Sequence, residues 1–213
     1  HGPYRAVYPA TLTPAEALAR LDLPPGARVI VSLGQVRPYK NIPHLIRTFR
    51  QLPDPATFLV IAGKATDPDL AAEVRTAAGD DPRVRLHLDF IPADAVQVYL
   101  RAAALVVLPY REILNSGSAI LALSFARPVL VPGQGALLEL ARGMGREWVR
   151  TYPGDLSAPA LRDALAWARE TPRDPAYGDP VPAGYSPAAP QPLVAFNPVA
   201  ALRAPEFARP DPV

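Results

Sequence analysis

Residues 28–52 read RVIVSLGQVRPYKNIPHLIRTFRQL, and the character of this stretch changes twice. Its first six residues, RVIVSL, form a continuous apolar run rich in β-branched side chains, which is typical of a strand buried on both faces. Residues 43–51 carry apolar side chains at helical spacing and predict a helix. The segment between them, GQVRPYKN, contains a glycine, an arginine and a lysine. A plain turn needs the glycine but neither cation, so the two charges indicate that an anion docks at this junction.

The same alternation of short apolar runs and helical patterns continues along the chain. Strands are predicted at 28–33, 57–62, 83–90, 104–109 and 127–132, and helices at 13–21, 43–51, 67–79, 93–103, 116–126 and 155–169. Thr13, Pro14 and Glu16 give the first helix the signature of a capping box. Short buried strands that alternate with helices indicate βαβ crossovers. We therefore predict an α/β fold, a doubly wound Rossmann-like parallel sheet with helices on both faces.

The distribution of proline divides the chain into two parts. Of the 28 prolines, 11 fall in residues 171–213, a stretch without sustained periodicity. Closely spaced prolines interrupt both helices and sheet ladders. Residues 1–170 are therefore predicted to form the folded domain, and residues 171–213 an extended or disordered tail. The start, HGPYRAVYPA, has no initiator Met and no signal-peptide character, so we expect the chain to be part of a longer protein.

The composition excludes several classes of function. The formal net charge is +2, from 22 basic and 20 acidic residues, which argues against a nucleic-acid-binding protein because such proteins need a concentrated basic face. The absence of cysteine excludes disulfides and thiolate metal sites and is compatible with a cytoplasmic location. The three histidines show no metal-ligand spacing, so no metal site is predicted. No apolar run approaches the ~18 residues of a membrane span.

The cations of GQVRPYKN lie where ligands bind in open parallel sheets, beyond the carboxyl ends of the strands. Gly34 allows a ligand close to the backbone. Arg37 offers a planar fork for two phosphate oxygens, and Lys40 adds a point charge three residues later. The alternative is an ordinary loop whose cations are solvated. The strand-end glycine favours an anion site.

A second anion site is predicted at the helix that follows the strand at 104–109. Ser116, Gly117 and Ser118 come directly before an apolar helix, whose free N–H groups and dipole attract anions. The same residues are also favoured as plain helix caps. A pyrophosphate held between this helix start and the Arg37–Lys40 pair accounts for both features.

Weaker signals stand at the other strand ends. Lys64 follows the second strand and provides either a third phosphate contact or an exposed turn residue. Phe90 and Ile91 follow the third strand and form either an apolar wall for a base or part of the core.

The combination of these segments resembles a known family. GQVRPYKN, the AGK at 62–64, RVRLHLDFIP, AALVVLPY and ILNSGSAILALSFARPVLVP make residues 1–170 similar to the C-terminal, donor-binding half of a GT-B glycosyltransferase of the family 4 type, also called group 1. The last segment resembles a subgroup in which SGS replaces Gly-Phe-Gly. The resemblance implies transfer of a sugar from a nucleoside diphosphate sugar, with retention of configuration and without a metal or other cofactor. The implied acceptor is a polysaccharide or a lipid-linked glycan.

The resemblance also assigns roles to single residues. Arg37 and Lys40 match the family's cations on the donor phosphates, the Ser-Gly-Ser segment matches the phosphate-cradling helix start, and Phe90 and Ile91 match the segment that flanks the base. Glu112 stands near the first carboxylate of the family's paired-glutamate motif and is expected to act on the donor sugar as a catalytic residue. The second carboxylate is expected near Leu121 or Ala122, where none is present.

The implied partner is an N-terminal GT-B domain, absent from these residues, that binds the acceptor and often carries a catalytic histidine. The chain alone is therefore expected to be inactive. Members of this subgroup often act on lipid carriers at the inner face of the cytoplasmic membrane, which predicts a cytoplasmic protein with peripheral membrane association. Two alternatives remain open: a nucleotide or phospho-ligand binding module without transferase activity, and a nucleotide-sugar epimerase of the same fold.

Overall fold

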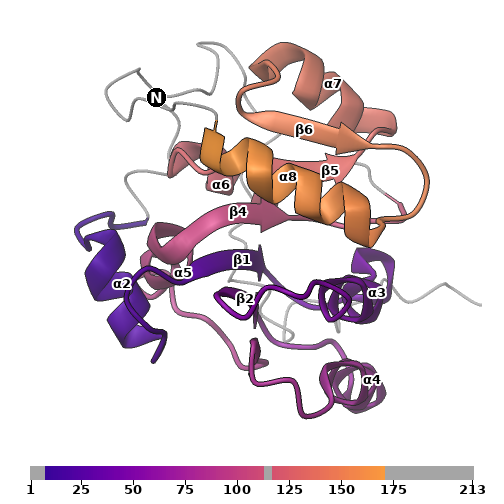
Figure 1. Ribbon diagram of the computed structural model, residues 1–213. Helices are drawn as coiled ribbons and strands as arrows, with labels where there is room; N and C mark the ends of the chain where they lie inside the picture. The colour runs from indigo at the N-terminus through magenta and orange to yellow at the C-terminus, as the bar shows by residue number, and fades with distance from the viewer. Residues whose placement is uncertain (1–7, 113–116, 171–213) are drawn as a thin grey trace, which may run out of the picture.

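A parallel sheet of six strands forms the centre of the computed structural model, which describes residues 8–112 and 117–170 (Figure 1). The strands are β1 (Arg28–Leu33), β2 (Thr57–Ala62), β3 (Val84–His87), β4 (Ala103–Val107), β5 (Val129–Pro132) and β6 (Val149–Tyr152). The helices are α2 (Pro14–Arg20), the 3-10 turn η1 (Pro38–Lys40), α3 (Ile42–Phe49), α4 (Pro68–Ala78), α5 (Val96–Ala102), α6 (Gly117–Ser124), α7 (Gly135–Met144) and α8 (Ala158–Glu170). The predicted proline-rich tail lies outside the described residues.

The predicted Rossmann-like fold is confirmed, with one strand and one helix more than expected. The strand order is β3-β2-β1-β4-β5-β6, and every pairing is parallel. The additional strand, β6, lies at the edge of the sheet, and its sequence, VRTY, contains two polar residues that hide the apolar run. The additional helix, α7, is framed and interrupted by glycines, which disguise its helical period.

Helices cover both faces of the sheet because the strand side chains alternate between two cores. On one face, Val31 and Val106 pack with residues of α2, α5, α6 and α7. On the other face, Ile30 and Leu105 pack with residues of α3, α4 and α8. The continuous apolar runs of β1 and β4 are therefore needed, since both sides of each strand are buried.

The arrangement of the crossovers determines where a ligand can bind. β1 pairs with β2 on one side and with β4 on the other. The chain leaves β1 through α3 on one face of the sheet and leaves β4 through α6 on the opposite face. The carboxyl ends of β1 and β4 thus form the topological switch point, where open α/β sheets bind their ligands.

Among the described residues, the longest helix is α8, and no helix has the length and apolar character that a membrane span needs.

Candidate functional site

The loops after β1 and β2 lie side by side beyond the strand ends. The Val36 N–H donates to the Lys64 carbonyl at 2.9 Å, and the Val36 carbonyl accepts from the Thr66 N–H at 3.0 Å. Gly63 makes this approach possible. A Cβ at that position would lie 2.4 Å from the Gly34 carbonyl oxygen, and the φ angle of Gly63 is +140°. The backbone of both loops is therefore fixed at the edge where a ligand would bind.

The loop after β1 is also tied to the loops after β4 and β5. The Tyr39 carbonyl accepts from the Arg111 N–H at 2.8 Å, and the Arg111 carbonyl accepts from Nε2 of Gln134 at 3.0 Å. The rings of Tyr39 and Tyr110 meet edge to face, with their centres 5.7 Å apart. These contacts join three strand ends around the switch point.

Lys40 is a buried cation at this junction. Its side chain is only 6% exposed, and its ammonium lies 5.4 Å from the centre of the Tyr110 ring. Within residues 8–112 and 117–170, no hydrogen bond or ion pair reaches that ammonium. The pKa of Lys40 is lowered to about 8, mainly because the ammonium is buried and to a smaller extent because of the charge of Arg37. A buried ammonium in these surroundings favours the approach of an anion, which would stabilise the charged form and raise the pKa again.

Arg37 is held in place by its own loop. Nε and Nη2 of Arg37 donate to Oε1 of Gln35, at 2.9 Å and 2.7 Å. The amide oxygen thus fixes the plane of the guanidinium. Gln35 was not predicted as a site residue, although it stands within the GQVRPYKN motif. Tyr110 was not predicted either, and its signal was an aromatic residue directly after a predicted strand.

The other predicted site residues have more varied surroundings. Gly117 begins α6, as predicted for a helix start at the switch point, and Ser118 is buried beside it, while Ser116 lies outside the described residues. The side chains of Lys64 and Glu112 are exposed. Their roles remain predictions.

Phe90 and Ile91 separate in the structure. Phe90 is 58% exposed beyond the end of β3, whereas Ile91 packs against the core. An exposed aromatic ring is suited to stack on a base, but the apolar wall expected from both residues is reduced to one. The position expected for the second family glutamate, near Leu121, lies on α6 and is buried in the hydrophobic core.

The sequence and the fold match those of known glycosyltransferases. The family model described as "Glycosyl transferases group 1" matches residues 27–168. A curated relative from Xanthomonas campestris pv. campestris (strain ATCC 33913), named GDP-mannose:glycolipid 4-beta-D-mannosyltransferase, is 36% identical over 147 residues, which cover 69% of this chain and 42% of the relative. The chain thus spans less than half the length of the curated relatives it matches.

Two solved structures show the same architecture. A sucrose-phosphate synthase from Thermosynechococcus elongatus superposes with a TM-score of 0.61 at 27% identity, over 78% of this chain and 43% of that one. The C-terminal domain of LpcC, a glycosyl transferase group 1 family protein from Francisella tularensis, superposes with a TM-score of 0.57 at 21% identity, over 76% of this chain and 85% of that domain. The expected fold, one half of a GT-B enzyme, is confirmed. The chain belongs to the group 1 glycosyltransferases.

Proposed function

We propose that these residues bind the nucleoside diphosphate part of a sugar donor at the carboxyl ends of β1 and β4, and that the protein transfers the sugar to a glycan or lipid-linked acceptor. The observation that carries the proposal is the buried ammonium of Lys40, which has no counter-ion among the described residues. Arg37, oriented by Gln35, supplies a second positive charge in the same loop. A diphosphate provides the negative charge that such a pair requires.

The donor we propose is GDP-mannose, because the curated relatives are named as GDP-mannose-dependent mannosyltransferases. The exposed ring of Phe90 is available to stack on the guanine base. The start of α6, at Gly117 and Ser118, faces the same switch point and adds N–H donors for the phosphates. Glu112 is proposed to contact the donor sugar.

In the proposed reaction, the bond between the anomeric carbon and the diphosphate oxygen breaks, and the oxygen of an acceptor hydroxyl bonds to that carbon and gives up its proton. Arg37 and Lys40 stabilise the charge that develops on the leaving diphosphate, as preorganised donors do in other transferases. Because this charge stabilisation comes from side chains, we propose that no divalent metal is needed. Equal transfer rates with and without a chelator are the expected result.

The stereochemical outcome is decided by the anomeric configuration of the product. The family resemblance implies retention. The names of the curated relatives specify a β-linked mannosyl product, which from an α-linked donor requires inversion. An NMR coupling measurement at the anomeric carbon of the first product distinguishes the two outcomes, since the two products differ in that configuration alone.

The acceptor is proposed to bind a part of the protein outside these residues, because the curated relatives are more than twice as long as the aligned region. Their names include a glycolipid acceptor, so we propose a lipid-linked acceptor and work at a membrane surface on its cytoplasmic side. Co-sedimentation of the longer protein with lipid vesicles tests this location. Recovery of all protein in the supernatant would count against it.

The donor site is tested by isothermal titration of the 213-residue chain with GDP, UDP and ADP at two salt concentrations. We expect GDP to bind best, with weaker binding at high salt. Arg37→Ala and Lys40→Ala should each reduce affinity by about 1–3 kcal/mol, the range for hydrogen bonds to charged groups. Arg75→Ala, which removes an exposed arginine from the last turn of α4, is the matched control and should bind normally. Equal binding by all four proteins would refute the site.

A further inference from the structure

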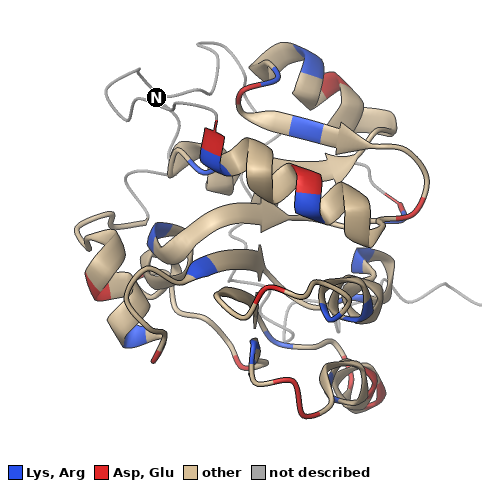
Figure 2. Cartoon of the chain, in the orientation of Figure 1, with Lys and Arg blue, Asp and Glu red and all other residues tan. Residues whose placement is uncertain are grey.

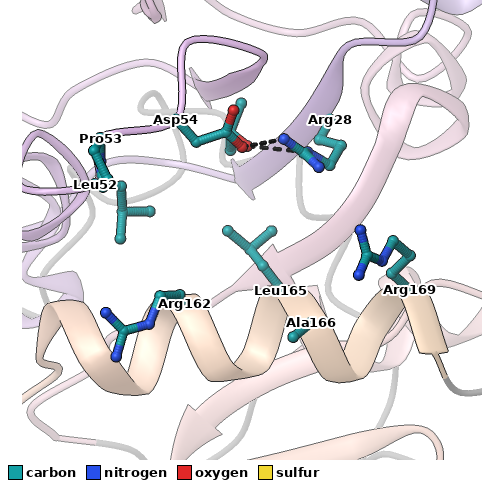
Figure 3. A pocket seen from close by; sticks show the side chains of 9 residues that line it. Arg28, Leu52, Pro53, Asp54, Arg162, Leu165, Ala166 and Arg169 are labelled. Carbon is teal, nitrogen blue, oxygen red and sulfur yellow. Dashed lines mark hydrogen bonds and ion pairs between the residues drawn. The ribbon is translucent and has the colours of Figure 1, made fainter.

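A pocket lies at the amino ends of β1 and β2, whereas the proposed donor site lies at the carboxyl ends of the strands. It has a volume of about 210 Å³ and opens between α8 and the segment that leads into β2 (Figure 3). Its lining includes Arg28 and Thr57, the first residues of β1 and β2. The proposed donor site lies instead at the carboxyl ends of β1 and β4. The pocket is therefore a separate feature, with the sheet between the two sites.

One face of α8 supplies half of the pocket. Arg162, Leu165, Ala166 and Arg169 all line it, at the spacing i, i+3, i+4 and i+7 that places side chains on one side of a helix. Leu52 and Pro53 stand opposite, with Leu165 pointing toward them in Figure 3. The floor is thus apolar, and arginines stand at both ends of the helical wall.

The residues that line the pocket include three arginines but a single carboxylate, that of Asp54. Asp54 is committed to Arg28, with which it forms an ion pair, and it also accepts from the Thr57 hydroxyl and from the Ala56 N–H at 3.0 Å. The Thr57 hydroxyl is the main cause that lowers the pKa of Asp54, so the carboxylate stays ionised and cancels the charge of Arg28.

Two positive charges remain, those of Arg162 and Arg169. Each lies near the carboxylate of the next residue, at 3.8 Å for Arg162 and Asp163 and at 3.6 Å for Arg169 and Glu170. Figure 2 shows these basic and acidic residues side by side along α8. All four side chains are more than half exposed, and exposed ion pairs of this kind contribute little to the stability of a protein. Both guanidinium groups can turn to a ligand at small cost.

We propose that this pocket binds a small amphiphilic anion, with its apolar body against Leu52, Leu165 and Ala166 and its carboxylate or phosphate between Arg162 and Arg169. Its volume of about 210 Å³ is smaller than the roughly 300–1,000 Å³ of drug-sized ligand sites, which favours a ligand smaller than a whole nucleotide sugar. The apolar floor selects against a bare inorganic anion, and the two arginines select against a neutral hydrocarbon.

The probe for the experiment is hexyl phosphate, added in low salt to the isotope-labelled 213-residue chain and followed by amide NMR shifts. Hexanoate, hexanol and inorganic phosphate are titrated in parallel. Hexyl phosphate should shift amides of α8 and of residues 52–57, and either charged head group on the six-carbon chain supports the proposal. Hexanol and inorganic phosphate should each bind at least about tenfold more weakly, since each lacks one of the two recognised parts.

Three variants locate the binding. Arg162→Ala and Arg169→Ala should each lower the affinity for hexyl phosphate by about three- to tenfold. Ala166→Phe should fill the pocket and abolish binding without disturbing the core, because Ala166 is exposed. Arg142→Ala, in the last turn of α7, is the charge-matched control and should leave the affinity unchanged. Unchanged binding in Ala166→Phe, equal affinity for hexanol, or shifts confined to the carboxyl ends of β1 and β4 would each overturn the proposal.

Discussion

The ammonium of Lys40 lies 5.4 Å from the centre of the Tyr110 ring, so the loop after β1 is joined to the loop after β4 by a cation–π contact. A carboxylate at this position would cancel the charge of the lysine. The face of an aromatic ring attracts the cation through its quadrupole and leaves the net charge intact. The arrangement therefore stabilises a buried cation while its field remains available to an anionic ligand.

Replacing the ring of Tyr110 should lower both the free energy of unfolding and the affinity of the donor site for GDP. In Tyr110→Leu the cation–π contact is lost, and the edge-to-face contact with Tyr39 is lost with it. We expect GDP affinity to fall by about three- to thirtyfold, corresponding to the roughly 0.5–2 kcal/mol of such contacts. Tyr110→Phe keeps the ring and should stay closer to the wild-type affinity. Titration calorimetry of both variants measures the difference, and identical losses in the two would show that the ring face is not responsible.

Removing the charge of Lys40 should affect stability and binding in opposite directions. Lys40→Met keeps an unbranched side chain of similar length but no longer buries an ammonium that lacks a counter-ion among the described residues. The ligand-free chain should therefore become more stable by about 1–2 kcal/mol, because the desolvation cost of the cation is removed. GDP affinity should fall by about 1–3 kcal/mol, as for Lys40→Ala. Thermal melts and calorimetry test the two effects separately, and a destabilised variant would contradict the account of an unpaired buried cation.

The lowered pKa of Lys40 also predicts a dependence on pH. In the folded chain without ligand this pKa is about 8, against 10.5 for an ordinary lysine. The unfolded chain then binds more protons between these values, so the contribution of Lys40 to the free energy of unfolding increases with pH across that window, by at most about 1.4 kcal/mol per pH unit. Donor binding requires the charged lysine, so GDP affinity should fall above pH 8.

Lys40→Met provides the control for this pH dependence. The difference in unfolding free energy between the wild type and the variant isolates the lysine from other groups that titrate at high pH. This difference should change between pH 8 and pH 10.5 and be constant between pH 6 and pH 7. A constant difference over the whole range would mean that the ammonium is not desolvated in the folded chain.

Sequence patterns predicted the fold well where burial determines the residue type. β1 and β2 were predicted with their observed bounds, because both faces of each strand are covered and the apolar run is continuous. The capping box of Thr13 and Glu16 is present as predicted, since it depends only on local spacing. β6 could not be recognised, because an edge strand tolerates the polar pair at Arg150 and Thr151.

The two cations of the candidate site could be chosen from the sequence, but the contacts that hold them in place could not. Arg37 and Lys40 followed from one motif after one strand. The contact between Lys40 and Tyr110 links positions 70 residues apart in the sequence, and no local pattern relates them. The separation of Phe90 from Ile91 depends on how a four-residue strand ends, which periodicity defines poorly.

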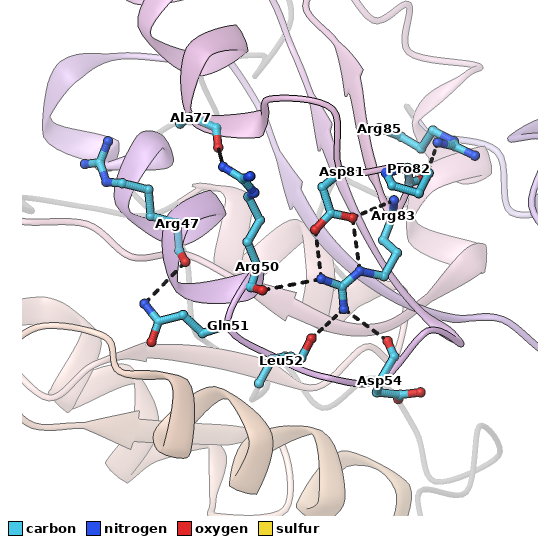
Figure 4. A network of polar contacts seen from close by, with 10 residues as sticks. All are labelled: Arg47, Arg50, Gln51, Leu52, Asp54, Ala77, Asp81, Pro82, Arg83 and Arg85. Atoms are coloured by element: carbon cyan, nitrogen blue, oxygen red, sulfur yellow. Dashed lines mark hydrogen bonds and ion pairs between the residues drawn. The ribbon is translucent and has the colours of Figure 1, made fainter.

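Arg83 should be one of the most important polar residues for stability (Figure 4). Its Nε and Nη2 donate to Asp81 at 3.0 Å and 2.8 Å, and its Nη1 donates to the backbone carbonyls of Leu52 and Asp54. One guanidinium thus joins the start of β3 to the segment before β2. Arg83→Ala should lower the free energy of unfolding by about 2–3 kcal/mol, as expected for lost hydrogen bonds to a charged group.

The neighbouring Arg85 is the control for this effect. Its guanidinium donates to the nearby Pro82 carbonyl and lies 5.8 Å from the centre of the Phe58 ring. Arg85→Ala should therefore lower the free energy of unfolding by less than about 1 kcal/mol, with both variants measured by urea titration. The hydrogen bond from Arg83 also holds the pKa of Asp81 below its usual value. The stability that this pair contributes is therefore complete above the unfolded-state pKa and is lost as the pH falls through the folded-state pKa. Arg83→Ala should be less acid-sensitive than the wild type, and equal sensitivity would contradict the assignment.

The close approach of the loops after β1 and β2 can be tested with two glycines that differ in their surroundings. Gly63 and Gly26 both have positive φ angles, +140° and +80°, so alanine is strained at either position. A Cβ at Gly26 would meet no atom within 4 Å, whereas a Cβ at Gly63 would lie 2.4 Å from the Gly34 carbonyl oxygen. Gly26→Ala should therefore lower the free energy of unfolding by about 1 kcal/mol and leave GDP affinity unchanged. Gly63→Ala should lower the free energy of unfolding by more than this, and it should also weaken GDP binding, because the two loops must move apart beside Arg37. Urea unfolding and calorimetry on both variants separate backbone strain from the clash, and equal effects would show that the loop contact does not support the donor site.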